Sequence, residues 1–105
     1  MAISLGDPAA MRAEAAMLRT QAEALASLAQ QVQARIDGLE FEGPAATRFR
    51  GSMADQSRRA AQLAGELQDL ANYVLRAAAR VEAQLTELRR QEELQREREA
   101  AREAQ

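Results

Sequence analysis

The side chains of this sequence that can do chemistry are carboxylates, hydroxyls and guanidinium groups, because the chain contains no histidine, cysteine or lysine. It holds two acidic pairs of the kind found in acid–base or metal sites, Glu92 with Glu93 and Glu97 with Glu99. Arginines alternate with these glutamates, a pattern typical of a solvated helix surface. Serine and threonine hydroxyls need an activating base, and neither histidine nor lysine is present to serve. We therefore expect a protein that is not an enzyme and has no catalytic, cofactor-binding or metal site.

Charge and composition exclude several kinds of partner. The net charge is −2 and the cluster of Arg48, Arg50, Arg58 and Arg59 is diluted by nearby acids, so we interpret the cluster as solvated surface and expect no nucleic acid. The glycines at 38 and 43 lack the lysine and the preceding strand of a phosphate-binding loop, and no small-molecule substrate is expected. The first residues also lack the apolar run of about 7 to 15 residues that a cleaved signal peptide carries.

Alanine and leucine at helical spacing predict a first helix over residues 8–37. Asp7 is a suitable N-cap, Pro8 suits the first helical position, and Asp37 with Gly38 supplies a left-handed stop. Apolar residues follow at alternating steps of four and three, which is the pattern of a helix-packing seam. The seam residues are Met11, Ala15, Leu18, Ala22, Leu25, Ala29, Val32, Ile36 and Leu39.

Two glycines and a proline mark a turn over residues 38–43, and a second helix is expected over about 44–94. Two helices joined by so short a connection lie antiparallel, so the chain is predicted to be an all-α, antiparallel two-helix hairpin. The predicted second seam consists of Phe49, Met53, Gln56, Ala60, Leu63, Leu67, Leu70, Val74, Ala77, Val81, Gln84 and Leu88.

Each helix carries a further stripe of apolar or small residues beside its seam, and one hairpin cannot cover both stripes. A second hairpin can, so we predict a four-helix bundle formed by a homodimer or a heterodimer. The further stripe consists of Met17 and Leu28 on the first helix and Ala61, Ala64, Ala71, Leu75 and Ala78 on the second.

The C-terminal part of the sequence is charged and has little apolar cover. Pairs such as Glu92 with Arg96 each add about 0.2 to 0.5 kcal/mol to helix stability, which does not prevent the end from fraying. We expect the hairpin to occupy residues 1–94 and residues 95–105 to be a mobile tail.

The segment from Phe41 to Phe49 is the most informative in the chain. It resembles the Trp-x-Gly turn of the early-secreted-antigen-like family, the small helical-hairpin substrates of type VII secretion systems. In that family an aromatic residue, a spacer and a glycine close the hairpin, and a phenylalanine about six residues later enters the core. Phe41, Gly43, Ala46 and Phe49 occupy those places here, with Phe41 in place of the tryptophan.

The resemblance also implies an export signal, Tyr-x-x-x-Asp/Glu, late in the second helix. Tyr73 is followed at the fourth position by Ala77, whereas Leu88 and Glu92 have the spacing without the aromatic ring. In the family, one hairpin can carry the signal beside the turn aromatic of its partner. The candidate partner or export contacts implied for this chain are Tyr73, Leu85, Leu88 and Glu92.

The function that follows from the resemblance is that of a small type VII secretion substrate or pairing partner. It acts through dimerisation and a composite recognition surface, with a secretion ATPase as a transient partner. The protein is expected in the cytoplasm before export and is then secreted without a cleaved signal peptide. Two alternatives stay open: a cytosolic coiled-coil adaptor or chaperone that is not itself exported, and the helical targeting segment of a larger toxin.

Overall fold

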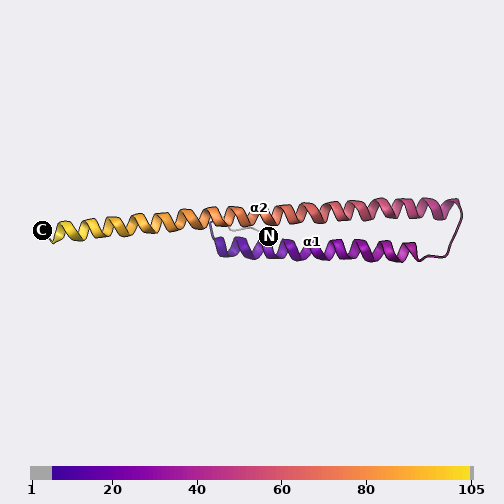
Figure 1. Cartoon of the computed structure of the whole chain (residues 1–105), viewed down its shortest axis with the longest axis horizontal. Helices are drawn as coiled ribbons and strands as arrows, with labels where there is room; N and C mark the ends of the chain where they lie inside the picture. Colours follow the sequence, from indigo (N-terminus) through magenta and orange to yellow (C-terminus); the bar gives the residue numbers. More distant parts are fainter. Residues whose placement is uncertain (1–5, 105) are drawn as a thin grey trace.

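Two long antiparallel helices make up the protein in a computed structural model that describes residues 6–104 (Figure 1). Helix α1 is Pro8–Asp37 and helix α2 is Pro44–Glu103, and the described residues contain no strand. The molecule measures 94 × 18 × 14 Å, since α2 runs past the start of α1 as a single helix. The prediction of an all-α antiparallel hairpin is confirmed. The first five residues of the expected hairpin and residue 105 of the expected tail lie outside the described residues.

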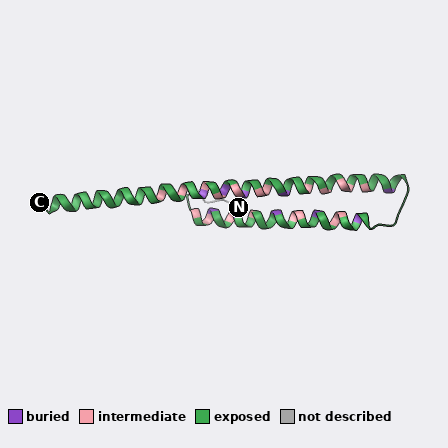
Figure 2. Ribbon diagram, in the orientation of Figure 1, coloured by how far each residue is buried: buried purple, intermediate pink, exposed green. Residues whose placement is uncertain are grey.

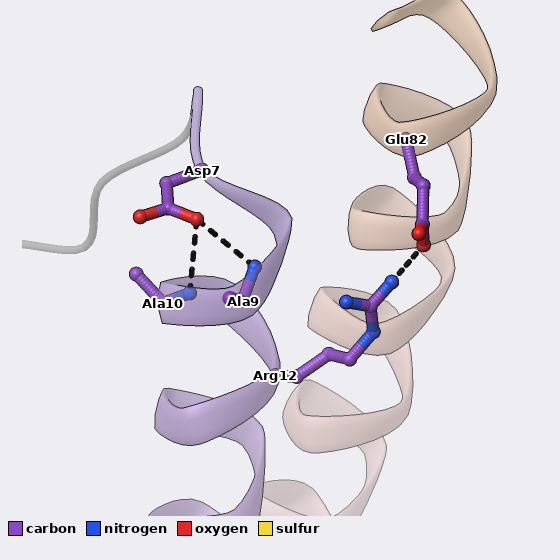
Figure 3. Close-up of polar contacts among 5 residues, drawn as sticks. All are labelled: Asp7, Ala9, Ala10, Arg12 and Glu82. Atoms are coloured by element: carbon purple, nitrogen blue, oxygen red, sulfur yellow. Dashed lines mark hydrogen bonds and ion pairs between the residues drawn. The ribbon is translucent and has the colours of Figure 1, made fainter. Parts of the chain in front are cut away.

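Local sequence explains where α1 begins and ends. One carboxylate oxygen of Asp7 accepts hydrogen bonds from the backbone N–H groups of Ala9 (3.0 Å) and Ala10 (3.4 Å), as Figure 3 shows. The prediction of a left-handed stop at Gly38 was wrong: its φ is −83°, and its N–H donates to the carbonyl oxygen of Ala34 as in a continuing helix. The left-handed residue is Gly43, with φ 111°, directly before Pro44 opens α2.

Small side chains form the contact between the helices. On α1 the buried residues belong to the predicted seam and are Met11, Ala15, Ala22, Ala29 and Ile36. On α2 the buried residues are Ala46, Ala64, Ala71, Val74 and Ala78. Alanines facing alanines let the two helix axes come close together, because the distance between packed helices depends on the side chains at the contact. Figure 2 shows these buried positions along the inner sides of both helices.

The seam predicted for α2 was correct at Val74, which is buried, but elsewhere the core lies one stripe away from the predicted residues. Phe49, Leu63 and Leu70, which were expected in the core, are 44%, 49% and 45% exposed. Conversely, Ala64, Ala71 and Ala78, which were assigned to the outer stripe, lie at 7%, 0% and 0% exposure in the core. Both stripes repeat every seven residues, so periodicity alone does not distinguish them. Close packing of the helices places Ala64, Ala71 and Ala78 in the contact with α1. It leaves the large side chains of Phe49, Leu63 and Leu70 outside.

Helix α2 ends at Glu103 and not near residue 94 as predicted. Every described residue from 86 onward is exposed, so no tertiary contact supports this segment (Figure 2). It is rich in alanine, glutamate, glutamine and arginine, which have high helix propensity, and Arg90 lies 3.4 Å from Glu87 one turn earlier. Helix propensity and neighbouring ion pairs together stabilise the helix over a longer stretch than the ion pairs alone predicted. Neither α1 nor the described part of α2 has a stretch long and apolar enough to cross a membrane.

Candidate functional site

The turn brings the predicted motif residues together at one end of the molecule. The ring centroids of Phe41 and Phe49 are 5.9 Å apart, and their planes are inclined at 55°. Gly43 separates them with a φ of 111°, a conformation that side-chain-bearing residues rarely adopt. Phe41 remains 37% exposed, so the turn presents an aromatic ring to the surroundings. Its role in recognition stays a prediction.

Arg50 holds this turn in shape. Its Nη2 donates hydrogen bonds to the backbone carbonyl oxygens of Leu39 (2.7 Å) and Phe41 (2.8 Å). Its guanidinium carbon lies 4.8 Å from the centroid of the Phe41 ring, within the range of a cation–π contact. The sequence interpretation placed Arg50 on solvated surface and missed this role. The available signal was its spacing, since Arg50 lies four residues after the buried Ala46, on the inner side of α2.

Replacing Arg50 by alanine is expected to loosen the turn. The change removes two hydrogen bonds from a charged donor and one cation–π contact, which together are worth about 1–3 kcal/mol at a partly exposed site. Hydrogen–deuterium exchange over residues 39–43 should accelerate and the melting temperature should fall. Arg48→Ala is the matched control, because Arg48 is exposed. Equal exchange rates and melting temperatures in the two variants would contradict the role of Arg50.

Large apolar side chains gather on one side of the hairpin, on a surface that we term the leucine face. A hollow between the helices on this side is lined by α1 residues Leu25, Leu28 and Val32 and by α2 residues that include Met53 and Ala60. The exposed residues of the displaced α2 stripe continue the same surface along the helix. The leucine face comprises Leu25, Leu28, Val32, Phe49, Met53, Ala60, Leu63, Leu67 and Leu70.

The opposite side of the hairpin carries polar contacts between the two helices. Arg12 forms an ion pair with Glu82 across the two helices there (Figure 3), and Arg19 Nη2 donates to Asn72 Oδ1 at 2.9 Å. The hollow on this side is lined mainly by alanine and polar side chains, among them Gln33 and Arg58. Large apolar side chains are therefore concentrated on the leucine face, which is the side better suited to packing against another apolar surface.

The candidate export contacts lie far from the turn of the same chain. Tyr73 and Leu88 are 56% and 54% exposed, Leu85 is half-buried, and Glu92 is exposed. At 1.5 Å per residue, Leu88 is about 66 Å along α2 from Pro44. The structure does not bring these residues together with Phe41 within one chain. Any surface that includes both needs a second hairpin.

The acidic pairs of the sequence lie on an exposed part of α2 that has no tertiary contacts. Glu92, Glu93, Glu97 and Glu99 are all exposed on the single-helix part of α2. No group of three or more potential metal ligands occurs in the part of the chain that the structure describes. These carboxylates lie among arginines on a solvated helix, as the alternating charges predicted.

Comparison with known families matches residues 6–85 to WXG100, described as proteins of 100 residues with WXG. No curated protein and no solved structure shows significant similarity to the chain. The match ends at residue 85, which is also the last half-buried position of α2, so the matched unit is the packed hairpin. It contains the turn with Phe41 and Gly43 between the two helices. The chain therefore belongs to the WXG100 family of non-enzymatic helical hairpins associated with type VII secretion.

Proposed function

We propose that this chain is a small type VII secretion substrate, or the pairing partner of one, and that it acts by dimerising with a second helical hairpin. The leucine face is the observation that carries the proposal. Leu63 and Leu70 are about half exposed on the hairpin alone, at 49% and 45%. Fully burying a leucine side chain stabilises by about 1.5–3 kcal/mol, so covering this face gives a substantial driving force for association. Pairing as hairpin dimers in the family supports the same conclusion.

The paired hairpins would present a composite recognition surface. The turn with Phe41 and the contacts Leu85, Leu88 and Glu92 lie at opposite ends of the hairpin, about 66 Å apart by helix rise. An antiparallel partner brings its own helix end beside this turn, and Tyr73 borders the face between them. A secretion ATPase is the transient partner that reads this surface. The pair forms in the cytoplasm and is then secreted without a cleaved signal peptide.

A charge placed on the leucine face tests the pairing. Leu63→Asp would bury an unpaired carboxylate in each copy of the interface, and the affinity for the partner hairpin is expected to fall at least about 100-fold. Ala61→Asp is the matched control, because Ala61 is exposed and lines the hollow on the other side of the same helix. Sedimentation equilibrium should be run on the chain alone and with any helical hairpin that a neighbouring gene encodes, and culture-supernatant levels should be measured for the same variants. An unchanged mass for Leu63→Asp would contradict pairing through this face. A stable pair that never reaches the supernatant would favour the cytosolic adaptor.

A further inference from the structure

The middle of the turn, residues 40–42, takes part in no backbone–backbone hydrogen bond with any described residue. On the α1 side, the N–H groups of Gly38 and Leu39 donate to carbonyl oxygens of the last helical turn, at 3.1 and 3.2 Å. On the α2 side, the carbonyl oxygen of Gly43 accepts from the N–H of Thr47 at 3.0 Å. The helices therefore fix the two ends of the turn and leave its middle to side-chain contacts.

Arg50 supplies these contacts to the middle of the turn. Its Nη2 donates to the carbonyl oxygens of Leu39 and Phe41, on either side of Glu40, at 2.7 and 2.8 Å. Glu40 and Glu42 are exposed, and neither forms an ion pair with a described residue. The guanidinium group thus binds the backbone of the turn and not the nearby carboxylates. It restrains the main chain that carries the Phe41 ring.

The same arginine also restrains the ring itself. Its guanidinium carbon lies 4.8 Å from the ring centroid of Phe41, and the ring of the adjacent residue Phe49 lies 5.9 Å away at an inclination of 55°. Both contacts come from the start of α2, so the ring is held against this helix. Phe41 nevertheless keeps 37% of its surface exposed. The exposed part of the ring is therefore offered in one orientation before a partner arrives.

A side chain that is fixed in advance binds a partner more tightly than a mobile one. A mobile turn and a freely rotating ring lose conformational freedom when a partner orders them, and this loss opposes association. Contacts that already hold the bound conformation reduce the loss. The hydrogen bonds and the ring contact of Arg50 are contacts of this kind for the turn.

We infer that Arg50 is a positioning residue for recognition of the turn: it acts through Phe41, by holding the backbone and the ring in the conformation that the secretion ATPase reads. The inference rests on the proposed composite surface and identifies the residue that sets the strength of its aromatic half. Arg50 uses its guanidinium group within the turn, on two carbonyl oxygens and one ring. Its effect on recognition therefore depends on the presence of the Phe41 ring.

A double-mutant cycle between Arg50 and Phe41 tests the inference. The probe is the soluble part of the secretion ATPase encoded in the same genome, and its Kd for the paired hairpins is measured. Arg50→Ala should weaken binding about tenfold, because the turn must then be ordered on binding. Phe41→Ala should weaken binding more strongly. The double variant R50A/F41A should match Phe41→Ala, since no ring is left to position, and the dimer mass should be unchanged in all three.

Arg48→Ala is the control for charge, because Arg48 is exposed and its removal changes the net charge equally. Equal weakening by Arg48→Ala and Arg50→Ala would overturn the inference in favour of general electrostatic attraction. A further loss of affinity on adding Arg50→Ala to Phe41→Ala would also overturn it, by showing that Arg50 contacts the ATPase directly.

Arg50→Lys separates positioning from folding. Lysine keeps the charge and the hydrogen-bond donors but lacks the planar guanidinium group, so this variant should bind with an affinity between those of the natural chain and Arg50→Ala. Restored exchange protection over residues 39–43 without any recovery of affinity would overturn the inference. Natural affinity in Arg50→Ala together with weak binding in Phe41→Ala would overturn the role of Arg50 and leave recognition of the turn standing. Natural affinity in both variants would remove the composite surface as well.

Discussion

Replacing Phe41 by alanine is expected to abolish export of the paired hairpins while leaving the hairpin folded. Phe41 is 37% exposed, and its ring lies beside Phe49 and Arg50 in the turn. Its removal should therefore cost less than the roughly 3–5 kcal/mol typical of truncating a fully buried phenylalanine. Recognition by the secretion ATPase, by contrast, depends on this ring, because the ring is part of the proposed composite surface. Melting temperature and culture-supernatant level, measured with the natural partner present, separate the two effects.

Phe49→Ala is the matched comparison for that experiment. The family resemblance placed Phe49 in the core, but its ring is 44% exposed at one end of the leucine face. We expect this variant to weaken pairing first and to lower export only as far as the dimer population falls. Normal export of a stably folded Phe41→Ala pair would exclude the turn as a recognition element and leave the cytosolic adaptor as the better interpretation.

Replacing Ala71 by aspartate is expected to separate the two helices. Ala71 is completely buried in the cluster formed with Met11, Ala15, Val74 and Ala78. A carboxylate there has no room and no partner, and burying it costs several kcal/mol, which is a large fraction of the stability of a small domain. Thermal unfolding followed by circular dichroism should show loss of the cooperative transition or a fall in its midpoint of more than about 10 °C.

The control for Ala71→Asp is Ala79→Asp, which makes the same chemical change at an exposed position of α2. It should alter the midpoint little, because a surface substitution away from special features usually changes stability by no more than about 0.5 kcal/mol. Similar melting curves for the two variants would show that the alanine stripe does not form the core. This comparison also separates the alanine stripe from the displaced leucine stripe predicted from periodicity.

The two helices and their antiparallel arrangement were determined by the sequence alone. Asp7 with Pro8 starts α1, Gly43 with Pro44 starts α2, and apolar residues at steps of four and three require each helix to pack along one side. These signals are local, because caps, turns and periodicity depend on residues a few positions apart. Because the turn is short, the two helices lie side by side and run in opposite directions. The turn motif with Phe41 and Gly43 was likewise legible in the sequence.

The role of Arg50 and the end of α2 depended on more than local pattern. An arginine side chain that reaches back to the carbonyl oxygens of Leu39 and Phe41 joins residues nine and eleven positions apart across a turn, and no periodicity encodes such a contact. The end of α2 at Glu103 reflects the sum of many weak helix-favouring terms. The predicted mobility of residues 95–105 stays a prediction, and only their helical conformation up to residue 103 is now described.

Tertiary structure alone decided which stripe of α2 faces α1. The alanines Ala64, Ala71 and Ala78 and the large residues Phe49, Leu63 and Leu70 repeat with the same seven-residue period, so both stripes satisfy the sequence pattern equally well. A hydrophobicity argument favours burying the leucines, but the hairpin leaves Leu63 and Leu70 exposed and buries the alanines instead. Close approach of the helix backbones favours the alanines, because dispersion contacts and helix separation depend on how small side chains fit across the whole interface. That comparison requires both helices at once, and its outcome leaves the leucines on the surface where a second hairpin can cover them.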